Sequence, residues 1–361
     1  MVLGSADKSI TYPKSIYYSA QPFSFGYFEN ALMIEPPSWD DEANQWLASI
    51  FGLTYERVVP PKDIDPDKAW EGYLQRIEKA LSAGYAVQTC RGWMAAKEEG
   101  GKIMSRLGGR LFWWEGLSKK HRPDMHYFTI IGIDRSQDKL YMHDPIMGWF
   151  GWGKDVEVPG KILRKAVERT PWQHRYITIT FRPSGEAAKS ETEMKDLLRE
   201  RIAKKIKGDP SVYNSLEMWQ AFFGITNAKR NFVHGIPALE AFRKDLRPER
   251  FVKILAAKFK KRKMKPSSVV SWLDLIMYHK AWVALIASEY LEETGQIEEW
   301  LRLFRLHMLY EQMWMSTTEL RSIFKKTNNI GQAMPRVEPL LTDMQNTIDQ
   351  IIHHLRSYLR S

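Results

Sequence analysis

Two side chains in one short stretch have the types and the spacing of a catalytic pair. His126 opens an apolar run, residues 127–133, and Asp144 closes the next one, residues 140–143. Residues 135–138 between the runs favour a turn. We therefore predict a β-hairpin whose two outer ends lie side by side. An imidazole within hydrogen-bond reach of a carboxylate is the base and orienting group of a catalytic triad.

The same two residues also have a purely structural interpretation. His126 could satisfy a buried backbone group, and Asp144, which precedes Pro145, could cap a turn where the strand ends. The motif alone does not separate the two interpretations, so the surrounding order of elements has to be considered.

The residues around this hairpin resemble a known family. Met-His-Tyr-Phe-Thr-Ile-Ile-Gly-Ile-Asp, followed by Lys-Leu-Tyr-Met-His-Asp-Pro, is similar to the histidine and aspartate strands of the papain-like C39 peptidase group. It looks closest to the branch typified by the amino-terminal domain of the butirosin biosynthesis protein H. There, a His heads one strand and an Asp-Pro closes the next, as His126 and Asp144 do here. The resemblance covers residues 10–183.

The resemblance implies a nucleophile that this chain lacks. The family places a cysteine at the start of its first helix, where the helix dipole lowers the thiol pKa, and a glutamine shortly before it that holds the oxyanion. Gln21 matches the glutamine, and Tyr27 stands where the cysteine is expected. We expect a helix from about residue 26 that ends before Pro36. Tyr27 has a high intrinsic pKa, Ser24 is the nearest alternative hydroxyl, and Gln21 is equally compatible with a plain loop.

The chain has a single cysteine, Cys90, which excludes an internal disulfide and any multi-cysteine metal site. Cys90 ends a predicted strand, residues 85–90, and does not start a helix. We therefore interpret it as a buried structural residue. The sequence has no phosphate loop, dinucleotide glycine pattern or zinc-ligand spacing, so we predict neither a cofactor nor a metal.

Periodicity divides the chain into two predicted domains. Residues 1–185 form an α+β, papain-like domain with an antiparallel sheet, and residues 191–361 form an all-α helical bundle. The first is expected to begin with an extended segment to about residue 26. It also holds an amphipathic helix capped by Asp65 and ended by Gly84. In the second, long helices are predicted at residues 267–293, 297–316 and 335–359.

The distribution of charge along the chain indicates which classes of binding partner to expect. The net charge is +10, of which residues 186–361 carry +8, with a basic run at residues 258–265. We interpret that run as a solvated helix end and loop, because no nucleic-acid module accompanies it. No signal peptide and no apolar run long enough for a membrane span is recognisable, so we predict a cytoplasmic protein with no membrane partner. The oligomeric state is not predicted.

These observations lead to three functional hypotheses. The first is a degenerate papain-like protein that keeps a cleft with His126 and Asp144 and binds a peptide, acyl or amine ligand without proteolysis. The second is an acyltransferase that moves an acyl group from an acidic acyl carrier protein to an amine, with His126 as base. The third, ranked last, is nucleic-acid binding through residues 258–265. Whether the protein is an enzyme is left open; if it is active, we expect an acyltransferase or an amide or thioester hydrolase, not a typical cysteine peptidase.

Overall fold

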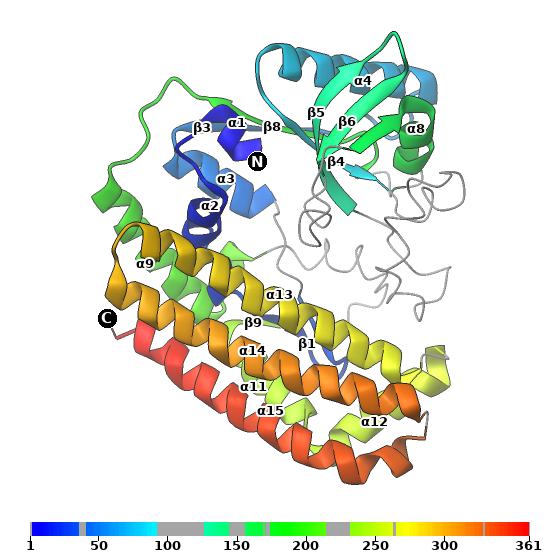
Figure 1. Ribbon diagram of the computed structural model, residues 1–361, viewed down its shortest axis with the longest axis vertical. Coiled ribbons are helices and arrows are strands. Elements are labelled where there is room, and N and C mark those ends of the chain that lie inside the picture. The colour runs from blue at the N-terminus through cyan, green and yellow to red at the C-terminus, as the bar shows by residue number, and fades with distance from the viewer. Residues whose placement is uncertain are drawn as a thin grey trace.

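The computed structural model describes residues 2–35, 41–91, 126–143, 156–168, 170, 174–213, 232–262, 265–327 and 329–360. Over these residues the fold is mixed α and β, with two antiparallel sheets and a helical carboxy-terminal region (Figure 1). The α+β class predicted from the sequence is therefore confirmed.

The larger sheet has six antiparallel strands in the order β3-β8-β4-β5-β6-β7. Its strands are β3 (Leu53–Val58), β4 (Val87–Arg91), β5 (His126–Asp134), β6 (Lys139–His143), β7 (Val156–Pro159) and β8 (Thr178–Pro183). Helices α4 (Pro66–Ser82) and α8 (Gly160–Glu168) pack on one face of this sheet. Their apolar stripes meet alternate strand residues such as Phe128 and Leu140, which line the same face because strand side chains alternate.

The hairpin predicted around residues 127–143 is present. β5 pairs with β6 from Thr129 opposite His143 to Asp134 opposite Lys139. The four residues between the strands form the turn, where Asp134 accepts hydrogen bonds from the Ser136 hydroxyl at 2.7 Å and the Gln137 amide at 3.1 Å. The predicted helix after Asp65 is also confirmed, because the Asp65 carboxylate accepts from two backbone amides of the first turn of α4.

The amino-terminal segment differs from both predictions made for it. It is not extended: it contains helices α1 (Val2–Ala6) and α2 (Tyr12–Tyr18) and a 3₁₀ turn, η1 (Gln21–Phe23). The helix predicted from about residue 26 is wrong, because that stretch forms strands β1 (Gly26–Phe28) and β2 (Met33–Ile34). Asn30 and Leu32 between them have positive φ, 56° and 49°, which a continuing helix cannot accommodate.

A long-range pairing explains the change from helix to strand. β1 lies at the centre of a three-stranded sheet, between β2 and β9 (Phe232–His234), which is about two hundred residues away in sequence. Phe28 stacks on Phe232 with ring centroids 4.2 Å apart. Tertiary pairing of buried aromatic residues therefore decides the conformation of this segment against its weak helical pattern.

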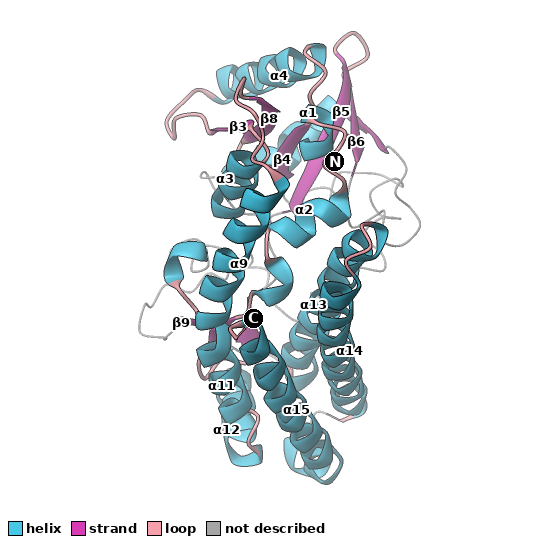
Figure 2. Cartoon of the chain, turned by 90° about the vertical axis from the view of Figure 1, so that its left-hand side faces the viewer, coloured by secondary structure: helices cyan, strands magenta, loops and turns pink. Residues whose placement is uncertain are grey.

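The other described elements are helical. They comprise α3 (Asp41–Ile50), α9 (Glu191–Lys207), η4 (Pro210–Val212), α11 (Gly235–Asp245), α12 (Pro248–Arg262), α13 (Pro266–Glu293), α14 (Ile297–Lys326) and α15 (Ile330–Tyr358). The all-α prediction for residues 191–361 is therefore correct for its described helices but wrong at β9, which pairs with β1 of the amino-terminal segment. The three predicted long helices correspond to α13, α14 and α15, although α14 extends ten residues further and α15 begins five residues earlier. Figure 2 shows these three helices below the larger sheet.

Helix α13 is long and apolar enough to cross a membrane by length and composition alone. Most of its apolar stretch is buried inside the protein, against α2, α14 and β2. Its composition is therefore explained by its place in the core. Of the basic run at residues 258–265, residues 258–262 form the end of α12 and Lys265 precedes α13, while residues 263–264 lie outside the described residues.

Candidate functional site

The backbone of His126 begins β5, next to β4 in the middle of the larger sheet. His126 pairs with Arg91, and the adjacent Tyr127 pairs with Cys90. The strand that should carry Asp144 ends at His143, so Asp144 lies outside the described residues. The structure thus contains the predicted hairpin that begins with His126, while the pairing of His126 with Asp144 stays a prediction.

Cys90 is fully buried in β4, with no exposed surface. Because directly paired residues of antiparallel strands lie on the same face, its neighbour across the sheet is the side chain of Tyr127. A free cysteine in this setting packs as a small apolar side chain. Cys90 lies in a sheet strand, as the sequence predicted. It therefore has neither the helix amino terminus nor the solvent access that a reactive thiolate needs.

A part-buried polar pair lies next to Cys90. The Tyr127 hydroxyl and Nδ1 of His174 are 2.7 Å apart. Burial lowers the pKa of His174 to about 4, with a smaller contribution from the charge of Arg57. Burial also raises the pKa of Tyr127 well above its usual value. Both groups are therefore uncharged at neutral pH, and the pair can hold a proton in place but has no solvent-facing nucleophile.

Acidic and basic side chains from the neighbouring helix and strand act on this pair. Arg57 Nε lies 3.3 Å from Asp41 Oδ2, and the Tyr55 hydroxyl donates a hydrogen bond to Oδ1 of the same carboxylate. The Asp41 charge opposes the effect of Arg57 on the pKa of His174. Nothing in the sequence singled out His174, which lies just before β8 and joins Tyr127 only through the folded sheet.

The three residues proposed to complete the catalytic site lie in a different part of the fold. Gln21 is in η1, Ser24 follows it directly, and Tyr27 is in β1 of the smaller sheet. All three are buried. Tyr27 and Ser24 contact the helical region through Asp245 and Lys280, whereas the backbone of His126 belongs to the larger sheet.

Tyr27 is held by a buried carboxylate. Its hydroxyl donates to Asp245 Oδ2 at 2.9 Å, and the Asn30 amide donates to the same oxygen at 2.6 Å. The Arg250 guanidinium donates to Asp245 Oδ1 at 2.7 and 3.0 Å. Burial, followed by the Asp245 charge, raises the pKa of Tyr27 well above its normal value. Tyr27 therefore stays protonated and serves as a structural hydrogen-bond donor.

A buried lysine contacts Ser24. Lys280 of α13 has 1% of its surface exposed, and its Nζ donates to the Ser24 carbonyl oxygen at 2.5 Å. Burial lowers the pKa of Lys280 to about 8, partly offset by the charge of Glu35. Sequence reasoning missed Lys280; the available signal is its place on the buried stripe of α13, between Met277 and Ala284.

Comparisons with known proteins give no family for the chain: no protein-family model and no curated protein matches it. Its function must therefore be argued from its own residues. Within the part of the chain that the structure describes, no group of three or more His, Cys, Asp or Glu side chains is arranged to hold a metal ion. The polar side chains described above are engaged in holding the fold.

Proposed function

We propose that this protein is a papain-like chain without a nucleophile, which binds a peptide, acyl or amine ligand and does not cleave it. Cys90 is the observation that carries the proposal. It is the only thiol of the chain, and it is fully buried in a sheet strand, one register position from His126. A thiolate nucleophile requires exposure and a positive environment. The proposal includes a cleft beside His126 and Asp144 and a cytoplasmic location.

An acyltransferase is the second candidate, because it needs no thiol. His126 would take a proton from the incoming amine, whose nitrogen attacks the thioester carbonyl. The C–N bond forms, the C–S bond breaks, and the carrier thiol leaves with the proton that His126 returns to it. The net charge of +8 on residues 186–361 supports an acidic carrier protein as donor, since opposite charges steer association.

The reactivity of Cys90 provides the first test. Native protein is treated with iodoacetamide across a range of pH, and the mass of the intact chain reports alkylation of the single thiol. We expect no reaction until denaturant is added, because the thiol is buried in β4. Rapid alkylation well below the usual thiol pKa of about 8.5 would instead identify an activated thiolate and contradict the proposal.

Turnover separates binding from acyl transfer. The wild type, Cys90→Ser and His126→Ala are each assayed with peptide amides and with acyl thioesters plus an amine. The ligand-binding proposal expects no turnover by any of the three. Turnover by the wild type and Cys90→Ser that is lost in His126→Ala would replace it with the acyltransferase.

A further inference from the structure

Helix α14 carries a line of exposed apolar side chains. Ile297, Leu301, Met308 and Met315 expose 54%, 55%, 49% and 65% of their surfaces. They are four of the six large apolar side chains that are exposed in the described parts of the chain. Leu301, Met308 and Met315 recur every seven residues, the repeat of a helix that packs against another helix.

The opposite side of α14 is already in use. Its buried residues face the core, and α13 and α15 flank it on either side (Figure 1). The exposed line is therefore a second apolar face on a helix whose first face is satisfied. A helix that is apolar on two faces is expected to have a second partner.

A line of charged residues runs beside the apolar one, also with a seven-residue repeat. Glu298, Arg305, Gln312, Glu319 and Lys326 are all exposed. None of the four charged side chains forms an ion pair with another residue that the structure describes. Their signs, read along the helix, are negative, positive, neutral, negative and positive.

When two copies of α14 lie antiparallel, each charged position of one copy faces a position of opposite charge on the other. A twofold axis beside Gln312 places Glu298 against Lys326 of a second copy, and Arg305 against Glu319 of that copy. The same antiparallel alignment brings Met308 alongside Met315 of the other copy. A parallel, in-register copy would place each charge against its own like, which is unfavourable. Charges that flank an apolar seam set the orientation of paired helices in this way.

We propose that the exposed face of α14 is the interface of an antiparallel homodimer, with a second copy of this chain as its occupant. The 30-residue helix supplies a seam of about 45 Å. Met308 and Met315 of the two copies provide the central apolar contact, and the two ion pairs, each formed twice by symmetry, fix the antiparallel orientation and the register.

The test is sedimentation velocity of the full chain over a range of concentrations. The wild type should sediment as a dimer at high concentration. Arg305→Glu faces Glu319 of the second copy, and Glu319→Arg faces Arg305, so each alone should weaken dimerisation at least about tenfold. The double variant, Arg305→Glu with Glu319→Arg, restores opposite charges and should recover the wild-type dimer.

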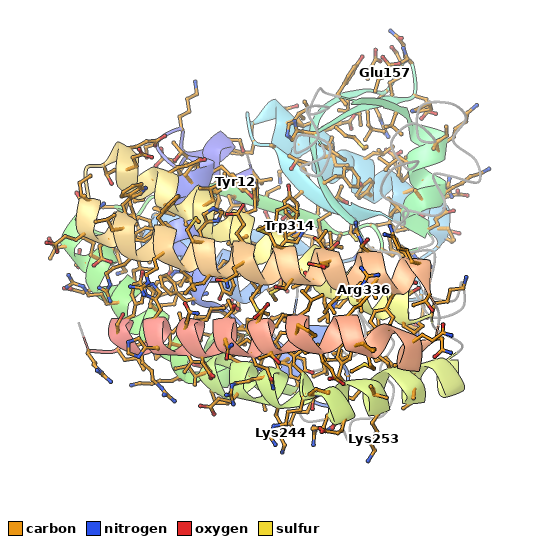
Figure 3. The ribbon with its side chains drawn as sticks, turned by 60° about the horizontal axis from the view of Figure 1, so that its bottom comes forward. Tyr12, Glu157, Lys244, Lys253, Trp314 and Arg336 are labelled. Atoms are coloured by element: carbon orange, nitrogen blue, oxygen red, sulfur yellow. The ribbon has the colours of Figure 1, made fainter. Side chains whose placement is uncertain are left out.

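Two controls make the result specific. Lys244→Glu changes the net charge as Arg305→Glu does, but Lys244 extends from α11 at the edge of the molecule away from Trp314 of α14 (Figure 3), and it should leave dimerisation unchanged. Met308→Glu should abolish dimerisation with unaltered circular dichroism, because the side chain is exposed.

Three outcomes would overturn the proposal. A wild type that stays monomeric at every concentration excludes the dimer. Failure of the double charge swap to restore association, with both single variants weakened, excludes the antiparallel register. A monomer that sediments with phospholipid vesicles through Met308 and Met315 would assign the face to a membrane surface instead.

Discussion

The buried side chain of His174, just before β8, makes the free energy of unfolding depend on pH. Its pKa is lowered to about 4 by burial, whereas in an unfolded chain it is about 6.5. Between these values the unfolded chain binds a proton that the folded chain does not. The free energy of unfolding therefore falls as the pH falls through this window, and this contribution is constant above it.

We predict that His174→Phe removes part of this acid sensitivity. The linkage for one such histidine is on the order of 3 kcal/mol when the window is crossed completely. Urea unfolding at about pH 7 and about pH 5 should show a smaller difference in the variant than in the wild type. Some sensitivity remains, because burial also lowers the pKa values of His234 and His279 to about 4.

An exposed histidine is the matched control. His353 on α15 is exposed, and His353→Phe should retain the wild-type dependence on pH. If His174→Phe and wild type lose the same free energy on acidification, His174 is protonated in the folded protein and the assignment of its neutral form is wrong.

At the scale of elements, the sequence predicted correctly those helices and strands whose own turn, capping and periodicity signals determine them. The β5–β6 hairpin, the capped helix α4 and the long helices α13 to α15 were all predicted. The strand that holds Cys90 was also predicted. β1 was not, because its pairing with β9 depends on residues about two hundred positions away. The pairs Tyr127–His174 and Lys280–Ser24 were missed for the same reason.

The hydrogen bond from β1 to the helical region gives a prediction for this element. Tyr27→Phe removes one donor to Asp245, which keeps the Asn30 amide and Arg250. The expected loss in the free energy of unfolding is about 1–2 kcal/mol. Asp245→Ala removes the acceptor of the Tyr27 hydroxyl and of the Asn30 amide, while Arg250, whose side chain is 35% exposed, keeps its hydrogen bond to Asn30 Oδ1. The expected loss is larger than for Tyr27→Phe, about 2–3 kcal/mol.

Chemical denaturation of the full chain measures both losses. Tyr141→Phe on β6 is the control, since its hydroxyl has no hydrogen-bond partner among the described residues, and it should change stability by less than about 0.5 kcal/mol. Equal losses in Tyr27→Phe and Tyr141→Phe would show that the Asp245 hydrogen bond does not stabilise β1.

At the scale of the whole molecule, the core crosses the division predicted between residues 185 and 191. Ile16, Phe25 and Tyr27 from the amino-terminal segment pack in the same core as Phe242 and Met277 from the helical region. The Arg201 guanidinium of α9 also donates to both carboxylate oxygens of Glu42 on α3, at 2.6 and 2.7 Å. The linker thus separates two regions of the sequence, but residues from both regions pack in one shared core.

This continuity predicts how the chain behaves when it is divided. Residues 191–361 produced alone lack β1, β2 and the aromatic side chains that cover α11 and α13, so apolar surface that is buried in the full chain becomes exposed. We expect this fragment to aggregate or to bind a hydrophobic dye, without a cooperative thermal transition. The full chain cut within the exposed linker at residues 186–189 keeps the shared apolar core and the Arg201–Glu42 ion pair, and should remain one particle with one transition. A fragment that melts cooperatively at the temperature of the full chain would show that the helical region is an independent domain, as the sequence pattern alone suggested, and that the shared core contributes little to its stability.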